Sequence, residues 1–480
     1  MSFFLKGLFP MDWIEDELSF LHLGDARLNN RAKKILTDFS ANPMKSIPES
    51  CKGWAETKAA YRFFDNELVN AKKIIKPHRI ATLKRIKAQP IVLLIEDTST
   101  LNYSGQKARE DIGPIQQDNV RGLFLHPMLA VTPERECLGV VSYEQWARSS
   151  FSHLSSEERK KARALKKTND KESYRWVKGY KKASRVAKAM PDTHCIYVTD
   201  REGDIYDIYH EAQQAAEKGA ADWLIRATFD RAILDEEQHT KRNRLKKKVK
   251  TSSSIGTVEF HLSPARNRKK RHVIQDIFVQ EVTLLPPRDK ARLGLGSVKI
   301  TTLIATETNP PPGEKPIEWT LLTSVPITDL EDALKVINWY LCRWQIEIFF
   351  KILKSGCTIE KLQLNDKKRY DPCLALYLIV AWRILFMTML GRAHPSLISE
   401  CIFEPMEWQT AYIMLYHKPP PQEPPTLKET LRMIAQLGGF LGRKHDGEPG
   451  SIVIWKGLQC LYSYMKARDA FSRAFGHTYG

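Results

Sequence analysis

Several kinds of site that are often visible in a sequence are missing from this chain of 480 residues. None of its eight cysteines forms a Cys-x-x-Cys pair, and no histidine cluster accompanies them. That spacing favours free thiols in a reducing compartment over a disulfide framework or a zinc site. The chain also lacks a Gly-rich phosphate loop and an order of Ser, His and Asp that suggests a triad, so nucleotide hydrolysis and acyl transfer have little support.

Long apolar runs are scarce as well. The stretch from Cys373 to Leu390 is long enough to cross a membrane, but Arg383 interrupts it. The charge near its middle, the preceding Pro372 and the lack of a second such stretch favour a buried helix over a membrane span. We therefore expect no membrane partner.

Acidic residues are few relative to basic ones. Lys and Arg number 74 against 56 Asp and Glu, which gives a formal net charge of +18 and a pI near 9.4. An excess of this size favours a nucleic acid as partner over a membrane surface or an acidic protein. The length favours two or three domains, each with a core of its own.

The hydrophobic pattern begins as helical and then becomes mixed. Residues 1 to about 70 are predicted to be helical, with Asp25 as a candidate cap. Ile91–Ile95 and Cys195–Val198 are continuous apolar runs, typical of strands buried on both faces. Two further β-like runs, Leu123–Val131 and Cys137–Trp146, predict a hairpin.

The second half of the chain extends this pattern. A basic helical segment is expected from Ser155 to Met190, and a strand at Trp223–Arg226. Residues from about 235 to 325 indicate a β-rich insertion, and the chain after Pro372 is again mostly helical. The order predicts an α/β fold, a mixed sheet with flanking helices that is interrupted by the insertion and bordered by helical terminal domains.

Two aspartates, Asp97 and Asp200, directly follow the two buried strands. Strand ends of open α/β sheets are common places for sites, and hard carboxylate oxygens suit Mg²⁺. Each aspartate alone is equally well explained as a turn or capping residue. Glu96, Glu202 and Asp204 are neighbouring carboxylates that compete for the same role.

A long helix is predicted from about Leu330 to Lys354, and it carries Tyr340, Arg343, Glu347 and Lys354. At about 100° per residue these four side chains fall within one narrow arc. A surface stripe of ion pairs would give the same pattern. Alternatively, Arg343 and Lys354 would hold phosphates, and Tyr340 would donate a hydrogen bond to one.

Taken together, the acids predict a catalytic site. Asp97, Asp200 and Glu347 could hold two divalent ions about 4 Å apart, one to activate water or a DNA 3′-hydroxyl and one to stabilise the leaving oxygen. We expect Mg²⁺ as the cofactor, with Mn²⁺ as a substitute.

The motif Tyr340-x2-Arg343-x3-Glu347-x6-Lys354 resembles the YREK signature of the insertion-sequence-four family of bacterial DDE transposases. The resemblance extends over nearly the whole chain and is most specific at this motif. Ile95–Thr98 and Asp200–Glu202 resemble the segments that carry the family's first and second catalytic aspartates. The resemblance implies an RNase H-like catalytic domain with a β insertion between the second and third acids.

Other roles come from the resemblance alone. Trp319 matches a tryptophan on which a flipped base stacks, although a strand tryptophan in a core is the simpler explanation. The segment from Trp54 to Phe63 resembles an end-recognition domain. Leu437–Phe440 and Trp455–Leu458 resemble a dimerisation region. Arg62 of this segment is a candidate DNA contact. Arg27, Arg31 and Lys34 are further candidates from their helical spacing on one face, although a solvated helix face explains them equally well.

The resemblance implies cut-and-paste transposition by a homodimer in the bacterial cytoplasm. The partners would be the element's terminal repeats and a target DNA, and the steps would be nicking, hairpin formation, hairpin opening and strand transfer. The expected domains are an end-binding domain (1–70), a catalytic domain (71–368) and a dimerisation domain (369–480). Two alternatives stay open: another RNase H-like nuclease, such as a junction resolvase, and a non-catalytic DNA-binding protein descended from a transposase.

Overall fold

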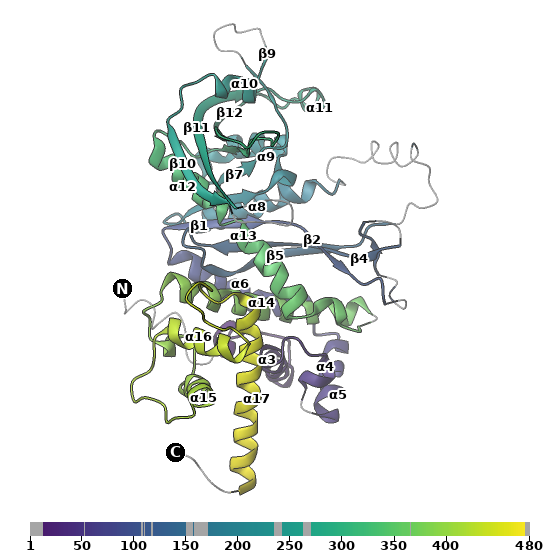
Figure 1. Cartoon of the computed structure of the whole chain (residues 1–480). Helices are drawn as coiled ribbons and strands as arrows, with labels where there is room; N and C mark the ends of the chain where they lie inside the picture. Colours follow the sequence, from purple (N-terminus) through teal and green to yellow (C-terminus); the bar gives the residue numbers. More distant parts are fainter. Residues whose placement is uncertain are drawn as a thin grey trace. The chain divides into compact units, whose positions relative to one another are not determined.

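The computed structural model describes residues 13–51, 53–106, 109, 111–116, 119–149, 157, 171–234, 242–262, 270–364 and 366–475. The chain forms two compact units (Figure 1). The helical unit comprises Met1–Ile86, Thr98–His153 and Gln345–Gly480, and the sheet unit comprises Lys87–Asp97 and Leu154–Trp344. Each unit is therefore assembled from stretches that are far apart in the sequence.

The sheet unit is a mixed α/β assembly. Its strands follow the order β1-β6-β7-β13-β12-β11-β8-β9, and β10 pairs with β11. The strands are β1 (Ile91–Glu96), β6 (His194–Thr199), β7 (Asp222–Arg226), β8 (Ala232–Leu234), β9 (Arg242–Arg244), β10 (Gly256–Leu262), β11 (Arg271–Leu284), β12 (Val298–Glu307) and β13 (Glu318–Thr323). The helices and short turns are α8 (Tyr174–Ala189), η2 (Arg201–Gly203), α9 (Tyr206–Ala215), η3 (Ala216–Lys218), α10 (Leu245–Lys250), α11 (Arg288–Arg292) and α12 (Leu330–Leu341).

β1, β6 and β7 pair in parallel, and their apolar runs are buried as the sequence predicts. α8 packs against β1 and β6. The region expected to be β-rich contains β9 to β12 and returns through β13, which pairs antiparallel with β7. Residues 155–156 and 158–170 of the predicted basic helix lie outside the described residues, and α8 is the helix observed in its described part.

The helical unit carries the predicted hairpin. β4 (Arg121–Val131) and β5 (Cys137–Trp146) pair antiparallel, and β2 (Ser99–Asn102) and β3 (Gly113–Pro114) also pair with β4. Its helices and short turns are α2 (Trp13–Glu17), α3 (Ala26–Ala41), α4 (Ile47–Ser50), α5 (Trp54–Asp65), α6 (Ala71–Lys87), α13 (Trp344–Lys351), η4 (Ile352–Gly356), η5 (Ile359–Lys361), α14 (Lys367–Ala393), η6 (Ser399–Cys401), α15 (Pro405–Tyr416), α16 (Leu427–Leu437) and α17 (Ser451–Phe475).

The apolar run near residue 380 forms α14, the central helix of this unit. Among the described residues it is the one helix long and apolar enough to cross a membrane, and its apolar window is fully buried within the protein. α14 packs against β5, α3, α5, α16 and α17, and Phe39 of α3 stacks on Tyr377 with ring centroids 4.6 Å apart. The buried helix that the sequence predicts is therefore present, surrounded by protein on all sides.

The prediction of one continuous helix from Leu330 to Lys354 is wrong. α12 ends at Leu341, Cys342 and Arg343 form a turn, and α13 begins at Trp344. α13 then passes into the π-helical turn η4, closed by the Cys357 N–H donating to the Ile352 carbonyl at 2.8 Å. A π turn adds a residue to the helical repeat, so a constant 100° per residue does not hold over this stretch.

Two glycines allow the last two long helices to approach each other closely. A Cβ on Gly438 would lie 2.0 Å from the Val453 carbonyl oxygen, and a Cβ on Gly457 would lie 1.7 Å from the Ile434 carbonyl oxygen. Neither position leaves room for any side chain because both obstacles are backbone atoms. The glycines of the two segments that resemble a dimerisation region thus hold α16 against α17.

We expect Gly457→Val to separate these helices and to lower the free energy of unfolding by at least about 1–3 kcal/mol, the usual effect of overpacking. The measurement is urea unfolding followed by circular dichroism. Gly450→Ala is the matched control because its Cβ would meet nothing within 4 Å. Equal stability of the two variants would contradict the close approach.

Candidate active site

Asp97 and Asp200 stand side by side at one edge of the sheet unit. β1 and β6 are parallel, and each of their register pairs, such as Ile95 with Val198, is separated by 103 residues. The same separation divides Asp97 from Asp200, so both aspartates stand two residues beyond the last pair. Neighbouring strands are about 4.8 Å apart, and both side chains are partly exposed. The two carboxylates therefore converge on one place.

The neighbouring acids have other partners. Asp204 is buried, and its carboxylate accepts hydrogen bonds from Arg231 Nε (2.9 Å), the Tyr209 hydroxyl (2.6 Å) and two backbone N–H groups, of Thr228 (2.7 Å) and Phe229 (3.0 Å).

Glu96 is also buried, and it accepts a hydrogen bond from the Tyr197 hydroxyl at 2.5 Å. Glu202 is exposed. Asp200 caps the turn η2, as the simpler sequence interpretation expects, by accepting from the Glu202 N–H through Oδ1. Its Oδ2 has no hydrogen-bond partner among the residues that the structure describes.

Arg343 is held against the first aspartate. Its NH1 lies 2.9 Å from Asp97 Oδ2, and both side chains are largely buried, with exposed fractions of 9% and 15%. The turn between α12 and α13 places this guanidinium, which also lies 5.8 Å from the Tyr340 ring centroid. The Arg343 guanidinium thus offsets negative charge at Asp97 in this structure.

Trp319 and Tyr340 form an aromatic pair in the same unit. Their ring centroids are 5.8 Å apart in an edge-to-face arrangement, and Trp319 is partly exposed, which a core tryptophan would not be. The side chain of Tyr340 is buried, hydroxyl included, and burial raises its pKa above the usual value. Tyr340 thus supports Trp319 from one side.

Arg226 is a site residue that the sequence interpretation missed. In the parallel pairing of β6 with β7, Thr199 is the partner of Ile225, so Arg226 lies next to Asp200, one residue further along each strand. The Arg226 guanidinium lies 5.8 Å from the Trp319 ring centroid. The sequence contains a usable signal, since Arg226 is the charged residue that ends the next buried strand. A cation here would favour a phosphate beside the aspartates.

Glu347 and Lys354 belong to the helical unit. Glu347 lies in the first turn of α13 and is partly exposed. Lys354 lies in η4 and donates from Nζ to Ser99 Oγ at 2.7 Å, and burial lowers its pKa.

The donor set of the two aspartates fits a divalent cation. Two carboxylates from adjacent parallel strands supply hard oxygen ligands, which Mg²⁺ prefers, and two carboxylates leave room for the waters that it usually keeps. Over the described residues, no group of three or more His, Cys, Asp or Glu is arranged to hold an ion. The aspartate pair is thus the part of the site that the sheet unit supplies by itself.

Three family models match the chain in succession. A "Transposase DNA-binding" domain matches residues 10–69, a "Transposase DDE domain" matches residues 173–370, and a "Transposase Tn5 dimerisation domain" matches residues 379–479. The chain is a Tn5-like DDE transposase. Its DDE domain makes it an enzyme of phosphoryl transfer on DNA, and members of such families generally use divalent metal ions. The matched DDE segment includes Asp200, Trp319 and Glu347.

The DNA-binding domain of the transposase contains the four basic residues expected to contact DNA. Asp25 caps α3 by accepting from the Arg27 N–H at 2.8 Å, as predicted, and Arg27 is exposed. Arg31 and Lys34 both pair with Glu56 of α5, whereas Arg62 is exposed on α5.

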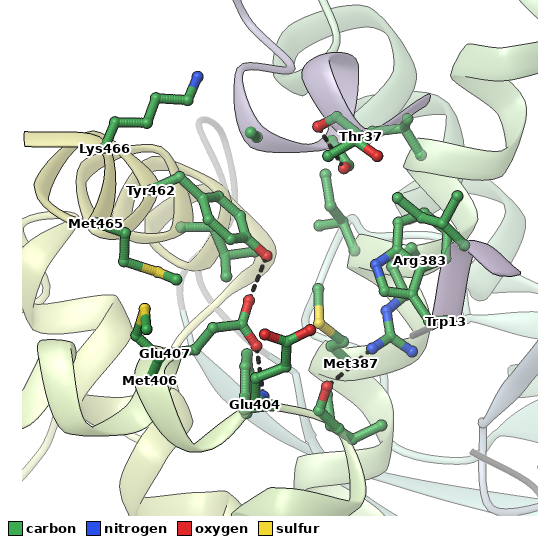
Figure 2. Close-up of a pocket in the computed structure, with 18 of the residues that line it drawn as sticks. Trp13, Thr37, Arg383, Met387, Glu404, Met406, Glu407, Tyr462, Met465 and Lys466 are labelled. Carbon is green, nitrogen blue, oxygen red and sulfur yellow. Dashed lines mark hydrogen bonds between the residues drawn. The ribbon is translucent and has the colours of Figure 1, made fainter. Parts of the chain in front are cut away.

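A pocket of about 410 Å³ lies in the helical unit of the transposase, next to α14 (Figure 2). Its charged groups are bound by the protein itself. The Glu407 carboxylate accepts from the Tyr462 hydroxyl (2.8 Å) and from the Glu404 N–H (2.7 Å), and Arg383 donates to the Ile402 carbonyl (3.1 Å). Burial raises the pKa of Glu407. The bond from Tyr462 joins α17 to α15, and the bond from Glu404 caps α15, so Glu407 serves the packing of these helices.

Proposed function

We propose that this transposase moves its own element by cut-and-paste transposition. It would nick one strand at each element end, use the new 3′-hydroxyl to form a hairpin, open the hairpin and join the ends to target DNA. The observation that supports this proposal is the pair of aspartates at matching positions after β1 and β6, with Arg343 bound to Asp97. The chain that carries them matches transposase models for DNA binding, catalysis and dimerisation.

Asp97, Asp200 and Glu347 would hold the divalent ions, which we expect to be two Mg²⁺, with Mn²⁺ able to replace them. When bound, such ions lower the pKa of water and neutralise charge on the leaving oxygen of an in-line displacement. The two aspartates fix the place of reaction from rigid strand ends. Glu347 would complete the set from the first turn of α13.

The remaining side chains would hold DNA around the acids. Arg343, released from Asp97, would bind a phosphate beside the scissile bond in a bidentate manner, with Lys354 as a second phosphate ligand. Tyr340 would donate a hydrogen bond to one of these phosphates or, through its ring contact, hold Trp319 in place. Trp319, with Arg226 behind its ring, would stack on a base that leaves the duplex.

We also propose how the domains divide the work. Residues 1–70 would recognise the terminal repeat through Arg27, Arg31, Lys34 and Arg62. Residues 71–368 would form the RNase H-like catalytic domain with its β-rich insertion, and residues 369–480 the helical dimerisation domain. In the homodimer each end would be bound by one subunit and cut by the other, so dimerisation would precede cleavage.

The experiment is cleavage of a labelled DNA fragment that carries the element boundary, by the purified protein with Mg²⁺ or with EDTA. Nicks at the boundary, then hairpins and double-strand breaks, are expected on a denaturing gel with Mg²⁺ alone, and joining to a target plasmid is expected to follow. Cutting without joining would favour a nuclease such as a junction resolvase. Shifted but uncut DNA under all metal conditions would favour a non-catalytic binding protein.

We expect Trp319→Ala to slow hairpin formation more than the first nick, because only the hairpin needs an unpaired base. Loss of one stacked base costs about 1–3 kcal/mol, or roughly 5- to 150-fold in rate. The measurement is the ratio of hairpin to nicked product over time. Trp319→Phe keeps an aromatic face and is the control; equal slowing of both steps by Trp319→Ala would exclude the stacking role.

A further inference from the structure

α8 presents a strongly cationic outer face. Over its 16 residues it contains six basic and no acidic side chains. At about 100° per residue the six lie within an arc of about 140°, while the buried face of the helix includes Trp176, Tyr180 and Ala183. The six are Arg175, Lys178, Lys181, Lys182, Arg185 and Lys188.

This composition opposes helix stability. Like charges three or four residues apart each destabilise a helix by about 0.2–0.5 kcal/mol, and α8 has several such pairs, for example Lys178 with Lys182. An ordinary solvated face alternates the two signs of charge. Lys181 does pair with Glu211 at 3.2 Å, but both side chains are exposed, so the pair adds little. Burial of the opposite face holds α8 in place, and a helix with six basic and no acidic residues favours an anionic partner.

The cationic face begins beside the proposed catalytic acids. The Tyr197 hydroxyl donates to the Trp176 carbonyl (3.0 Å) in the first turn of α8 and also to Glu96, the neighbour of Asp97. A Cβ on Gly179 would lie 1.7 Å from Glu96 Oε2, so the helix backbone rests directly on this strand end. From Arg175 to Lys188 the face extends about 20 Å along the helix.

We propose that this face of α8 binds the phosphate backbone of the target duplex, a surface separate from the domain at residues 10–69 that binds the element end. A stripe of about 20 Å can follow several successive phosphates. Lysines and arginines on an exposed helix read charge rather than base sequence, as binding to arbitrary target DNA requires. The proposal rests on the proposed function, because a target is used only if the ends are joined to other DNA.

The test compares two triple variants at exposed positions of α8. Lys178→Gln/Arg185→Gln/Lys188→Gln removes three charges, and Gln keeps the helix propensity. Lys178→Arg/Arg185→Lys/Lys188→Arg keeps the charges and is the matched control. Binding to an unrelated duplex is measured between 50 and 150 mM salt. We expect the slope of log affinity against log salt to fall by about 2.7 in the neutral variant, so that the parent loses roughly 20-fold more affinity over this range.

Strand transfer then identifies the DNA that is bound. The first assay uses element ends that are already cut and so carry no flanking DNA; the neutral variant is expected to join them to a plasmid at least about 10-fold more slowly than the unmodified protein at 150 mM salt. The second assay uses ends that still carry flanking DNA, and here the neutral variant is expected to cut as fast as the unmodified protein. A defect in cutting with normal transfer would overturn the proposal in favour of flanking donor DNA. An unchanged slope and unchanged transfer would also overturn it. If the unmodified protein binds duplex DNA but never joins element ends to it, the result would contradict the proposed function instead. The salt dependence of binding would still show whether the cationic face of α8 contacts DNA.

Discussion

Replacing Asp97 with Asn is expected to abolish cleavage at the element ends while the protein stays folded and bound to DNA. Asp97 directly follows β1, is partly exposed, and forms an ion pair with Arg343. An amide oxygen can still accept from this guanidinium, so the local structure should persist. The lost charge is the property that a divalent ion needs. We expect cleavage to fall by at least about 10²–10³-fold.

Asp200→Asn should act in the same way, since Asp200 stands level with Asp97 on the neighbouring strand. The measurement is the rate of Mg²⁺-dependent nicking of a labelled end, with a gel shift to confirm DNA binding. Glu202→Gln is the matched control because Glu202 is an exposed carboxylate two residues from Asp200. Full activity of either aspartate variant would remove the aspartate pair from the mechanism.

Replacing Asp204 with Ala is expected to do the opposite, namely to unfold the sheet unit rather than to stop its chemistry directly. The buried carboxylate of Asp204 is the acceptor for Arg231 and for the backbone N–H groups of Thr228 and Phe229. Its removal leaves the guanidinium of Arg231 buried without its counter-charge. Breaking a buried ion pair in this way costs about 3–5 kcal/mol.

Urea unfolding followed by tryptophan fluorescence would measure this loss, because Trp223 packs on Tyr209, which itself donates to Asp204. The double variant Asp204→Ala/Arg231→Met should recover part of the stability, since no buried charge is left unpaired. A stable Asp204→Ala protein that cannot cut DNA would show that Asp204, and not Asp200, belongs to the catalytic set.

Much of this protein was determined by local sequence. Continuous apolar runs predicted β1 and β6, because a strand buried on both faces needs an unbroken apolar stretch, and the short run Trp223–Arg226 predicted β7. The same runs placed Asp97 and Asp200 at strand ends. The spacing from Tyr340 to Lys354 carried the family resemblance, which the matched transposase models bear out.

The tertiary structure alone decided which of the neighbouring carboxylates are available. Asp200 and Asp204 are four residues apart and look alike in the sequence, yet one faces solvent at the strand end and the other is bound by Arg231. The strand register that puts Asp97 and Asp200 at matching positions, and the place of Arg226 beside Trp319, also depend on pairing between residues far apart in the sequence. A sequence fixes spacing along the chain, whereas register, burial and breaks in a helix result from contacts between residues far apart in it.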